Sequence, residues 1–224
     1  MKKILLGMTL LSTVAMGAEG TNLYLRAGAD INGKFDVVVD NRQIANKKKA
    51  DKIGHEIAVE VTKEVLPNFE LGLGIAYQDH GKAKKNIYND SYAGEKVTAY
   101  YEIPEMKSVP LYVTTKYNLP VNTMVKPYIK ADLGYSFNKI DGKLGVVDIR
   151  DGKRLNLPSY ETDVKDGVYF GIGGGFEYND FTMDLMYKIN KAELEYGEQG
   201  SEKREKKDLD YSRVTLSVGY KFNF

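Results

Sequence analysis

Residues 53–78 read IGHEIAVEVTKEVLPNFELGLGIAYQ, and this stretch contains two runs of alternating residues joined by a short link at residues 66–68. In the first run, residues 53–65, most odd positions are apolar and three of the even positions are glutamates. In the second run, residues 69–78, large apolar residues alternate with Glu, Gly, Ala and Gln. Successive side chains of a strand point to opposite faces, so each run predicts a strand with one apolar face and one polar or small face. Three glutamates opposite branched aliphatics are typical of a strand between lipid and a polar interior.

The same period of two recurs in six further runs. They cover residues 22–31, 109–118, 128–137, 168–178, 181–190 and 213–224. Each holds about ten residues, the length that crosses a bilayer when a strand is tilted by about 45°. Because lipid cannot satisfy a bare sheet edge, such strands must close on themselves. The sequence predicts an all-β fold, an eight-stranded antiparallel up-and-down transmembrane β-barrel.

Short and long connections alternate along the chain. The short ones are residues 66–68, 119–126 and 179–180. The long ones are polar and charged, and they cover about residues 33–52, 80–108, 138–165 and 191–212. Short periplasmic turns and long outer loops are the usual arrangement of an outer-membrane barrel. We expect the long connections to be outer loops that form the interaction surface.

The first residues predict export. Lys2 and Lys3 precede an apolar run at residues 4–15, and small residues follow up to Ala18. This is the order of a secretory signal peptide, and the run is too short for a membrane-spanning helix. We expect residues 1–18 to be removed by cleavage after Gly17 or Ala18. Residues 19–224 would then form the barrel in the bacterial outer membrane.

Composition narrows the function classes. The chain contains no cysteine, which excludes a lipid-modified N-terminus, a disulfide framework and thiolate metal sites. Lys and Arg together number 32 and Asp and Glu 31, so the formal net charge is +1. This balance gives no reason to expect a nucleic-acid partner. We expect no cofactor, no metal and no catalytic residue, and we expect a monomer.

The polar faces of the predicted strands carry acids and bases that should fill the lumen as a structural charge network. They are Arg26, Asp30, Glu56, Glu60, Glu64, Glu70, Lys116, Lys130, Asp132, Glu177, Asp184, Lys188, Arg213 and Lys221. Side chains fill the interior of a barrel of this size, and buried charges need partners because lone burial costs several kcal/mol. We therefore expect a paired network and no wide pore.

Aromatic residues gather at the ends of the apolar faces. Near the short connections lie Phe69, Tyr117, Phe176, Tyr178, Phe181, Tyr220, Phe222 and Phe224. Near the long connections lie Tyr77, Tyr135, Phe137 and Tyr187. Amphipathic rings prefer the level of the lipid headgroups, so the two groups predict two interfacial girdles.

Three segments resemble a known family. The last residues, 218–224, alternate aromatics and end in Phe, as in the terminal strand of bacterial outer-membrane barrels. Residues 109–117 and 127–137 resemble the opacity-protein-like, OmpA-type outer-membrane β-barrel domain family. The resemblance implies the barrel fold, and it implies that Tyr220, Phe222 and Phe224 form an assembly signal read by the barrel assembly machinery.

Two motifs invite a catalytic or nucleotide-binding interpretation. Residues 171–175 read GIGGG, but Phe176 stands where a dinucleotide loop needs its last glycine and no helix pattern follows, so we interpret the run as a strand. The chain has two histidines, His55 near the outer end of a predicted strand and His80 at the start of a long connection. His80 has Asp79, Asp90 and Ser91 near it in sequence, which leaves an acyl-transfer arrangement open.

Four functions remain as hypotheses. The first is a non-enzymatic outer-membrane protein with a structural or adhesin-like role, in contact with lipid, lipopolysaccharide and an extracellular ligand. Basic runs at residues 47–49 and 202–207 could attract lipopolysaccharide phosphates or acidic partners, and the first is the more basic. The alternatives are a narrow porin-like channel for small solutes, a lipid A-modifying enzyme, and a soluble periplasmic β protein.

Overall fold

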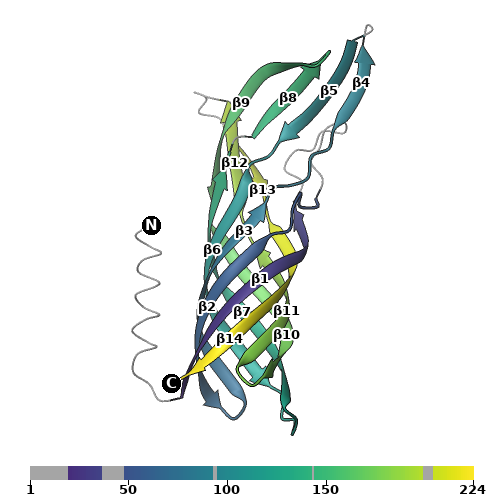
Figure 1. The fold of residues 1–224 in the computed structure, drawn as a ribbon. Coiled ribbons are helices and arrows are strands. Elements are labelled where there is room, and N and C mark those ends of the chain that lie inside the picture. The colour runs from purple at the N-terminus through teal and green to yellow at the C-terminus, as the bar shows by residue number, and fades with distance from the viewer. Residues whose placement is uncertain (1–19, 37–47, 93–94, 143, 199–203) are drawn as a thin grey trace.

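The computed structural model describes residues 20–36, 48–92, 95–142, 144–198 and 204–224. The predicted signal peptide, residues 1–18, lies outside the described residues, as does part of the first long connection. Eight strands close into an antiparallel barrel in the order β1-β14-β11-β10-β7-β6-β3-β2 (Figure 1). They are β1 (Thr21–Phe35), β2 (His55–Leu66), β3 (Phe69–Gly81), β6 (Glu105–Asn118), β7 (Val125–Asp141), β10 (Gly167–Tyr178), β11 (Phe181–Asn190) and β14 (Tyr211–Asn223). This architecture confirms the predicted fold.

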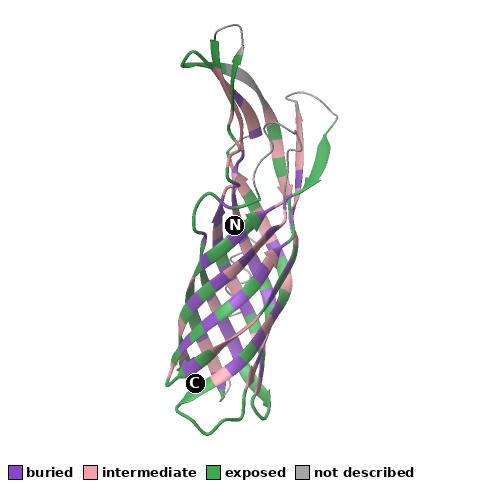
Figure 2. Cartoon of the chain, turned by 90° about the vertical axis from the view of Figure 1, so that its right-hand side faces the viewer, coloured by how far each residue is buried: buried purple, intermediate pink, exposed green. Residues whose placement is uncertain are grey.

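The barrel is inside out with respect to a soluble protein. Along its strands buried and exposed residues alternate, which gives the chequered pattern of Figure 2. On β7, Asp132 is 1% exposed and its neighbour Leu133 is 62% exposed. The charged face therefore lies inside and the aliphatic face outside, the arrangement that a bilayer selects.

Two of the short connections are tight turns that need special backbone geometry. Asn68 lies between β2 and β3 with φ of 65°, and Asn179 lies between β10 and β11 with φ of 52°. Asn tolerates this left-handed conformation better than most residues do. The start of β1 lies at the same end, since the Gly20 N–H donates to the Phe224 carbonyl over 2.9 Å. We call this the short-turn end.

Three of the four long connections are not irregular loops. They contain strands β4 (Tyr88–Tyr92), β5 (Glu95–Glu102), β8 (Leu144–Arg150), β9 (Lys153–Lys165), β12 (Glu193–Glu198) and β13 (Glu205–Asp208). These strands pair in the order β13-β12-β9-β8-β5-β4, and the resulting sheet continues beyond the barrel (Figure 1). We call it the distal sheet. The alternation of apolar residues did not predict these strands, because their charged and mixed composition breaks it; on β5, for example, Lys96 and Tyr100 share a face.

An apolar layer joins the distal sheet to the barrel. We call it the apolar cap, and its buried members are Phe35, Ala50, Ala83, Ile103, Met106, Leu144, Ala192, Leu194, Leu209 and Tyr211. Phe35, Met106 and Tyr211 come from barrel strands, whereas Leu144 and Leu194 come from the distal sheet. The cap therefore lies across the long-connection end of the barrel. Among the described residues, no helix is long and apolar enough to cross a membrane.

Candidate functional site: the barrel lumen and the distal sheet

The lower part of the lumen, nearest the short-turn end, holds a cluster around Lys116. The Lys116 Nζ lies 2.7 Å from Glu177 and 3.2 Å from Glu70, and Glu177 also pairs with Lys221. Glu70 accepts further hydrogen bonds from the Tyr24 hydroxyl at 2.9 Å and the Thr62 hydroxyl at 2.6 Å. Six strands contribute these side chains, so the cluster connects the barrel wall across its interior.

The middle cluster is centred on Arg26 and Glu60. Arg26 Nε lies 3.0 Å from Glu60, and its Nη1 pairs with Asp184. Lys130 lies between Glu60, at 2.5 Å, and Asp132, at 3.2 Å. The shared lysine and the bridging arginine leave each of these carboxylates with a cation. Burial of such groups is tolerated only with pairing of this kind.

The upper cluster joins Arg213, Lys188 and two acids. Arg213 lies 3.2 Å from Asp30 and 3.5 Å from Glu56, and Glu56 also pairs with Lys188. Gly171 sits opposite Lys188 in the sheet register, and a Cβ added there would lie 3.2 Å from Asp132 Oδ2. This inward glycine therefore leaves room for the longer side chains.

Above the charged clusters lies a layer of neutral polar residues. The Gln78 amide donates to Glu56 at 2.9 Å and accepts from Asn190 at 2.9 Å. Asn190 also donates to the Ser136 hydroxyl at 2.8 Å, and Ser136 donates to Asn138 at 2.8 Å. Hydrogen bonds thus continue from the upper cluster to the base of the apolar cap. Buried polar groups are stable only when they are paired in this way.

His80 belongs to this neutral layer and not to a solvated loop. It lies within β3, is 0% exposed, and its ring packs 4.3 Å from the ring of Tyr211. Its Nε2 lies 3.0 Å from the hydroxyl of Ser108, a residue that the sequence analysis did not associate with it. Asp90 instead accepts a hydrogen bond from Tyr88 on the distal sheet. The structure therefore does not assemble the acyl-transfer arrangement of His80 with Asp79, Asp90 and Ser91: the Asp79 carboxylate accepts from the Gly81 N–H, and Asp90 and Ser91 lie on β4. The second histidine, His55, is exposed at the start of β2.

The lumen residues predicted from the sequence fall into three groups. Twelve are at most 5% exposed: Arg26, Asp30, Glu56, Glu60, Glu70, Lys116, Lys130, Asp132, Glu177, Asp184, Lys188 and Arg213. Lys221 is half-buried, with a side chain that is 16% exposed. The inward placement of Glu64 is wrong: it is exposed at the turn, where its carboxylate accepts from the Asn68 N–H.

Sequence reasoning missed the lumen tyrosines. Tyr24, Tyr112, Tyr128 and Tyr169 are each at most 3% exposed. Tyr112 donates to Glu60 at 2.9 Å and Tyr128 donates to Asp184. Their positions on the charged faces of the strands were the available signal, but aromatics were assigned only to the girdles. The four rings therefore lie inside the lumen beside the ion pairs and add to the side chains that fill it.

The two faces of the distal sheet differ in character. On one face Tyr160 and Tyr196 meet edge to face, with ring centroids 6.0 Å apart, beside the half-buried Tyr101. Burial and a hydrogen bond to Glu205 raise the pKa of Tyr196 to about 12. The other face carries ion pairs, such as that of the exposed Lys206 with the half-buried Glu195 at 2.8 Å. The hydrogen bond from Lys206 lowers the pKa of Glu195.

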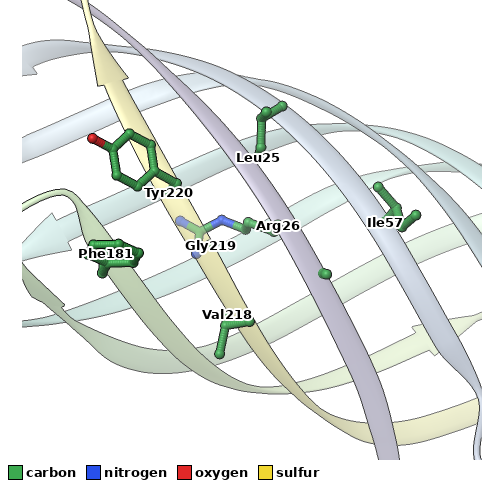
Figure 3. A pocket seen from close by; sticks show the side chains of 8 residues that line it. Leu25, Arg26, Ile57, Phe181, Val218, Gly219 and Tyr220 are labelled. Atoms are coloured by element: carbon green, nitrogen blue, oxygen red, sulfur yellow. The ribbon is translucent and has the colours of Figure 1, made fainter.

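A shallow depression on the outside of the barrel crosses the seam between β1 and β14. Figure 3 shows Leu25, Ile57, Val218 and Tyr220 around it, with Phe181 on the left in this view. The side chain of Arg26 belongs to the lumen instead. The depression is nearly wholly apolar, so it suits lipid chains and not a polar solute.

In the described ranges, the side chains are not grouped as a metal centre requires. No group of three or more His, Asp or Glu side chains there could hold an ion. The carboxylates that lie close together in the lumen are instead held by lysines and arginines. The chemistry of this region is therefore that of a packed ionic interior.

Comparison with known proteins identifies the family of this chain. Residues 4–222 match the family described as outer membrane protein beta-barrel domain. Over 236 residues the chain is 29% identical to an uncharacterized protein of Pasteurella multocida (strain Pm70), which covers 99% of this chain and 98% of that protein.

The chain also matches solved structures of bacterial proteins at low sequence identity. Neisserial surface protein A is 13% identical with a TM-score of 0.47, covering 92% of this chain and 99% of its own. OprG of Pseudomonas aeruginosa is 12% identical with a TM-score of 0.49, and the match covers 93% of this chain and 99% of OprG. Ail of Yersinia pestis, solved with the heparin analogue sucrose octasulfate, is 13% identical with a TM-score of 0.44, covering 92% and 100%.

The family match confirms the resemblance to outer-membrane barrels that the terminal strand and the alternating segments carry. It also confirms the bacterial outer membrane as the location of the protein. The aliphatic exterior, the ionic lumen and the matched residues agree: this chain belongs to the outer membrane protein beta-barrel domain family.

Proposed function

We propose that this protein is a non-enzymatic surface protein whose barrel holds the distal sheet outside the cell, where the sheet binds an extracellular partner. The observation that carries the proposal is the distal sheet itself, six strands built from three connections and fixed to the barrel by the apolar cap. In outer-membrane barrels the short turns face the periplasm. The distal sheet then lies on the outside.

The character of the sheet supports an interaction role. Among the described residues, β4 and β13 are its edges, and each edge leaves backbone N–H and C=O groups without a strand partner. Such edges are templates for pairing with another chain. The half-buried tyrosines Tyr101, Tyr160 and Tyr196 add amphipathic rings of the kind enriched at binding interfaces.

The lumen supports an anchoring role for the barrel. Each cluster connects opposite walls through ion pairs, and tyrosine rings fill the space between the clusters. The apolar cap then covers the end that carries the sheet. A barrel packed in this way fits a rigid support better than it fits the alternative of a narrow solute channel.

The test shortens the sheet and keeps the cap. In the variant, residues 88–102 and 145–159 are each replaced by a short Gly-containing turn, which leaves Ile103, Leu144 and Leu194 in place. We expect the barrel to fold, as shown by its shifted gel mobility without heating, and binding of cells to host-cell or matrix surfaces to be lost. A matched control replaces residues 119–124 at the short-turn end and should bind as the parent does. Undiminished binding by the shortened variant would contradict the proposal.

The enzymatic alternative has its own test. Because His80 is buried beneath Tyr211, it cannot reach a lipid unless the apolar cap moves. We expect lipid A from cells that carry folded His80→Ala protein to have the same mass spectrum as lipid A from parent cells. A changed acylation pattern, with unchanged amounts of folded protein, would favour the lipid A-modifying enzyme instead.

A further inference from the structure

Three extended segments lie side by side at the rim, where the barrel meets the apolar cap. The end of β1 pairs with residues 48–50, since Ala50 N donates to the Gly33 carbonyl at 3.0 Å. Residues 48–52 pair in turn with residues 82–84, since Lys84 N donates to the Lys49 carbonyl at 2.8 Å. The structure thus combines two connections that are distant in sequence into one small patch of sheet.

The register of this patch places three lysines directly opposite one another. Lys34 is the antiparallel partner of Lys49, and the pairing of Ala50 with Ala83 sets Lys84 opposite Lys49 on its other side. Ala50 and Ala83 are buried, whereas Lys34, Lys49 and Lys84 are all exposed. The three side chains therefore lie in a row on the outward face. We call them the lysine row.

The row lacks the acidic partners that other lysines of this protein have. In the part of the chain that the structure describes, none of the three has an ion pair, although nearby Lys52 lies 3.2 Å from Glu105. The adjacent row contains Asp51 opposite Lys82, but the Asp51 carboxylate accepts from the Lys82 backbone N–H. Like charges directly opposite one another destabilise a sheet. An anion bound across the row would remove that repulsion.

The position of the lysine row along the membrane normal indicates which anion it meets. Ile31 and Ile53, exposed at 63% and 71%, are the last aliphatic residues on the outside of β1 and before β2. Lys34 follows Ile31 by three residues, about 10 Å along an extended strand and about 7 Å along the membrane normal at a tilt of about 45°. The headgroup layer of a bilayer leaflet extends roughly 5–7 Å beyond the hydrocarbon. The row therefore lies where lipid phosphates lie.

We propose that Lys34, Lys49 and Lys84 bind the phosphate groups of the glycolipid that surrounds the barrel in the outer leaflet, the lipid A part of lipopolysaccharide. Lysine ammonium groups attract phosphate as point charges, and a row that spans three segments meets two phosphates on one sugar pair. The site goes beyond the basic run at residues 47–49, because the fold sets Lys34 and Lys84 on either side of Lys49. The proposal rests on the proposed orientation of the barrel but not on any partner of the distal sheet.

The test measures lipid binding to purified protein in detergent by native mass spectrometry. The probes are bisphosphorylated lipid A and the same lipid after enzymatic removal of its phosphates. The variant is K34Q/K49Q/K84Q. The matched control is K96Q/K153Q/K207Q, which removes the same charge from exposed lysines of the distal sheet.

We expect the variant to bind bisphosphorylated lipid A at least tenfold more weakly than the parent, and the control to remain within twofold. The parent should bind dephosphorylated lipid A at least tenfold more weakly than the phosphorylated form. Equal binding by the variant and the parent, or equal binding of the two lipids by the parent, would overturn the proposal. A third probe, the soluble polyanion sucrose octasulfate, distinguishes a lipid site from a general anion site. The proposal would also be overturned if the variant lost binding of this soluble anion but kept that of lipid A. Because purified protein is used, this result is independent of the cell-binding test of the distal sheet.

Discussion

In the barrel, Arg26 and Glu60 form an ion pair whose side chains are 3% and 2% exposed, whereas in the distal sheet Arg154 and Glu102 pair with side chains 58% and 44% exposed. The two pairs are chemically alike, with Nε–O and Nη2–O distances of 3.0 and 3.3 Å. They differ in surroundings. Loss of one partner in a dry interior leaves an uncompensated charge, whereas water solvates a charge that is left at the surface.

The apolar residues of the two regions differ in the opposite sense. Leu185 on the barrel is 51% exposed and Leu216 is 40% exposed, but Leu144 and Leu194 of the distal sheet are 1% and 0% exposed. The chain thus changes at the rim from a lipid-facing exterior to a conventional buried core. The apolar cap is the place where the two arrangements meet.

The largest effect is expected from the middle cluster. Replacing Arg26 by Met leaves Glu60 and Asp184 without their shared cation and should destabilise the barrel by about 3–5 kcal/mol. Arg154→Met at the exposed pair should cost about 1 kcal/mol or less. Urea unfolding in lipid vesicles, followed by gel mobility, measures both. Similar costs for the two variants would show that the lumen is as wet as the surface.

A smaller effect, confined to the distal sheet, is expected from the apolar cap. Leu194→Ala opens a cavity in the cap and should weaken the attachment of the sheet by about 2–5 kcal/mol. Hydrogen exchange of β9 and β12 should accelerate while the barrel strands stay protected. The matched barrel variant, Leu185→Ala, faces lipid chains that fill the space and should change exchange little. If hydrogen exchange accelerated in the same strands of both variants, the proposed difference between the two regions would be contradicted.

The smallest effect concerns alkaline pH. The pKa of Tyr196 is raised from 10.0 to about 12 by burial and by Glu205, so folding favours the neutral phenol. Its contribution is complete below pH 10 and is lost as the pH rises toward 12. Absorbance titration should show one component near pH 12 that disappears in Tyr196→Phe, a variant that otherwise folds. An unchanged titration curve would show that Tyr196 is solvated.

The sequence determines the barrel better than it determines the distal sheet, and the reason is the solvent on each side. Because lipid lies outside the barrel and ion pairs lie inside it, apolar and polar side chains alternate strictly along each strand. Asp132 and Leu133 can therefore be assigned to opposite faces from their odd and even positions alone. The distal sheet has water on much of both faces. Its strands therefore mix Tyr, Lys and Glu with no clear period, and β8 and β9 were expected to be loop.

The partners within the lumen could not be predicted either. Parity places Lys130 and Glu60 in the interior, but their contact joins β7 to β2 across the barrel and depends on register and tilt. The lysine row is a similar case, because Lys49 and Lys84 become neighbours only through the pairing of two connections. The inward placement of Glu64 was wrong for a local reason. The alternation of odd and even positions does not show where a strand ends and its side chains leave the lumen.

The central claim is that side chains fill the lumen from the short-turn end to the apolar cap. The most direct measurement is the flux of small ions through proteoliposomes whose content of folded barrel is verified by gel mobility. We expect the flux to match that of protein-free vesicles. Steady ion flux in proportion to the amount of folded parent protein would contradict the account.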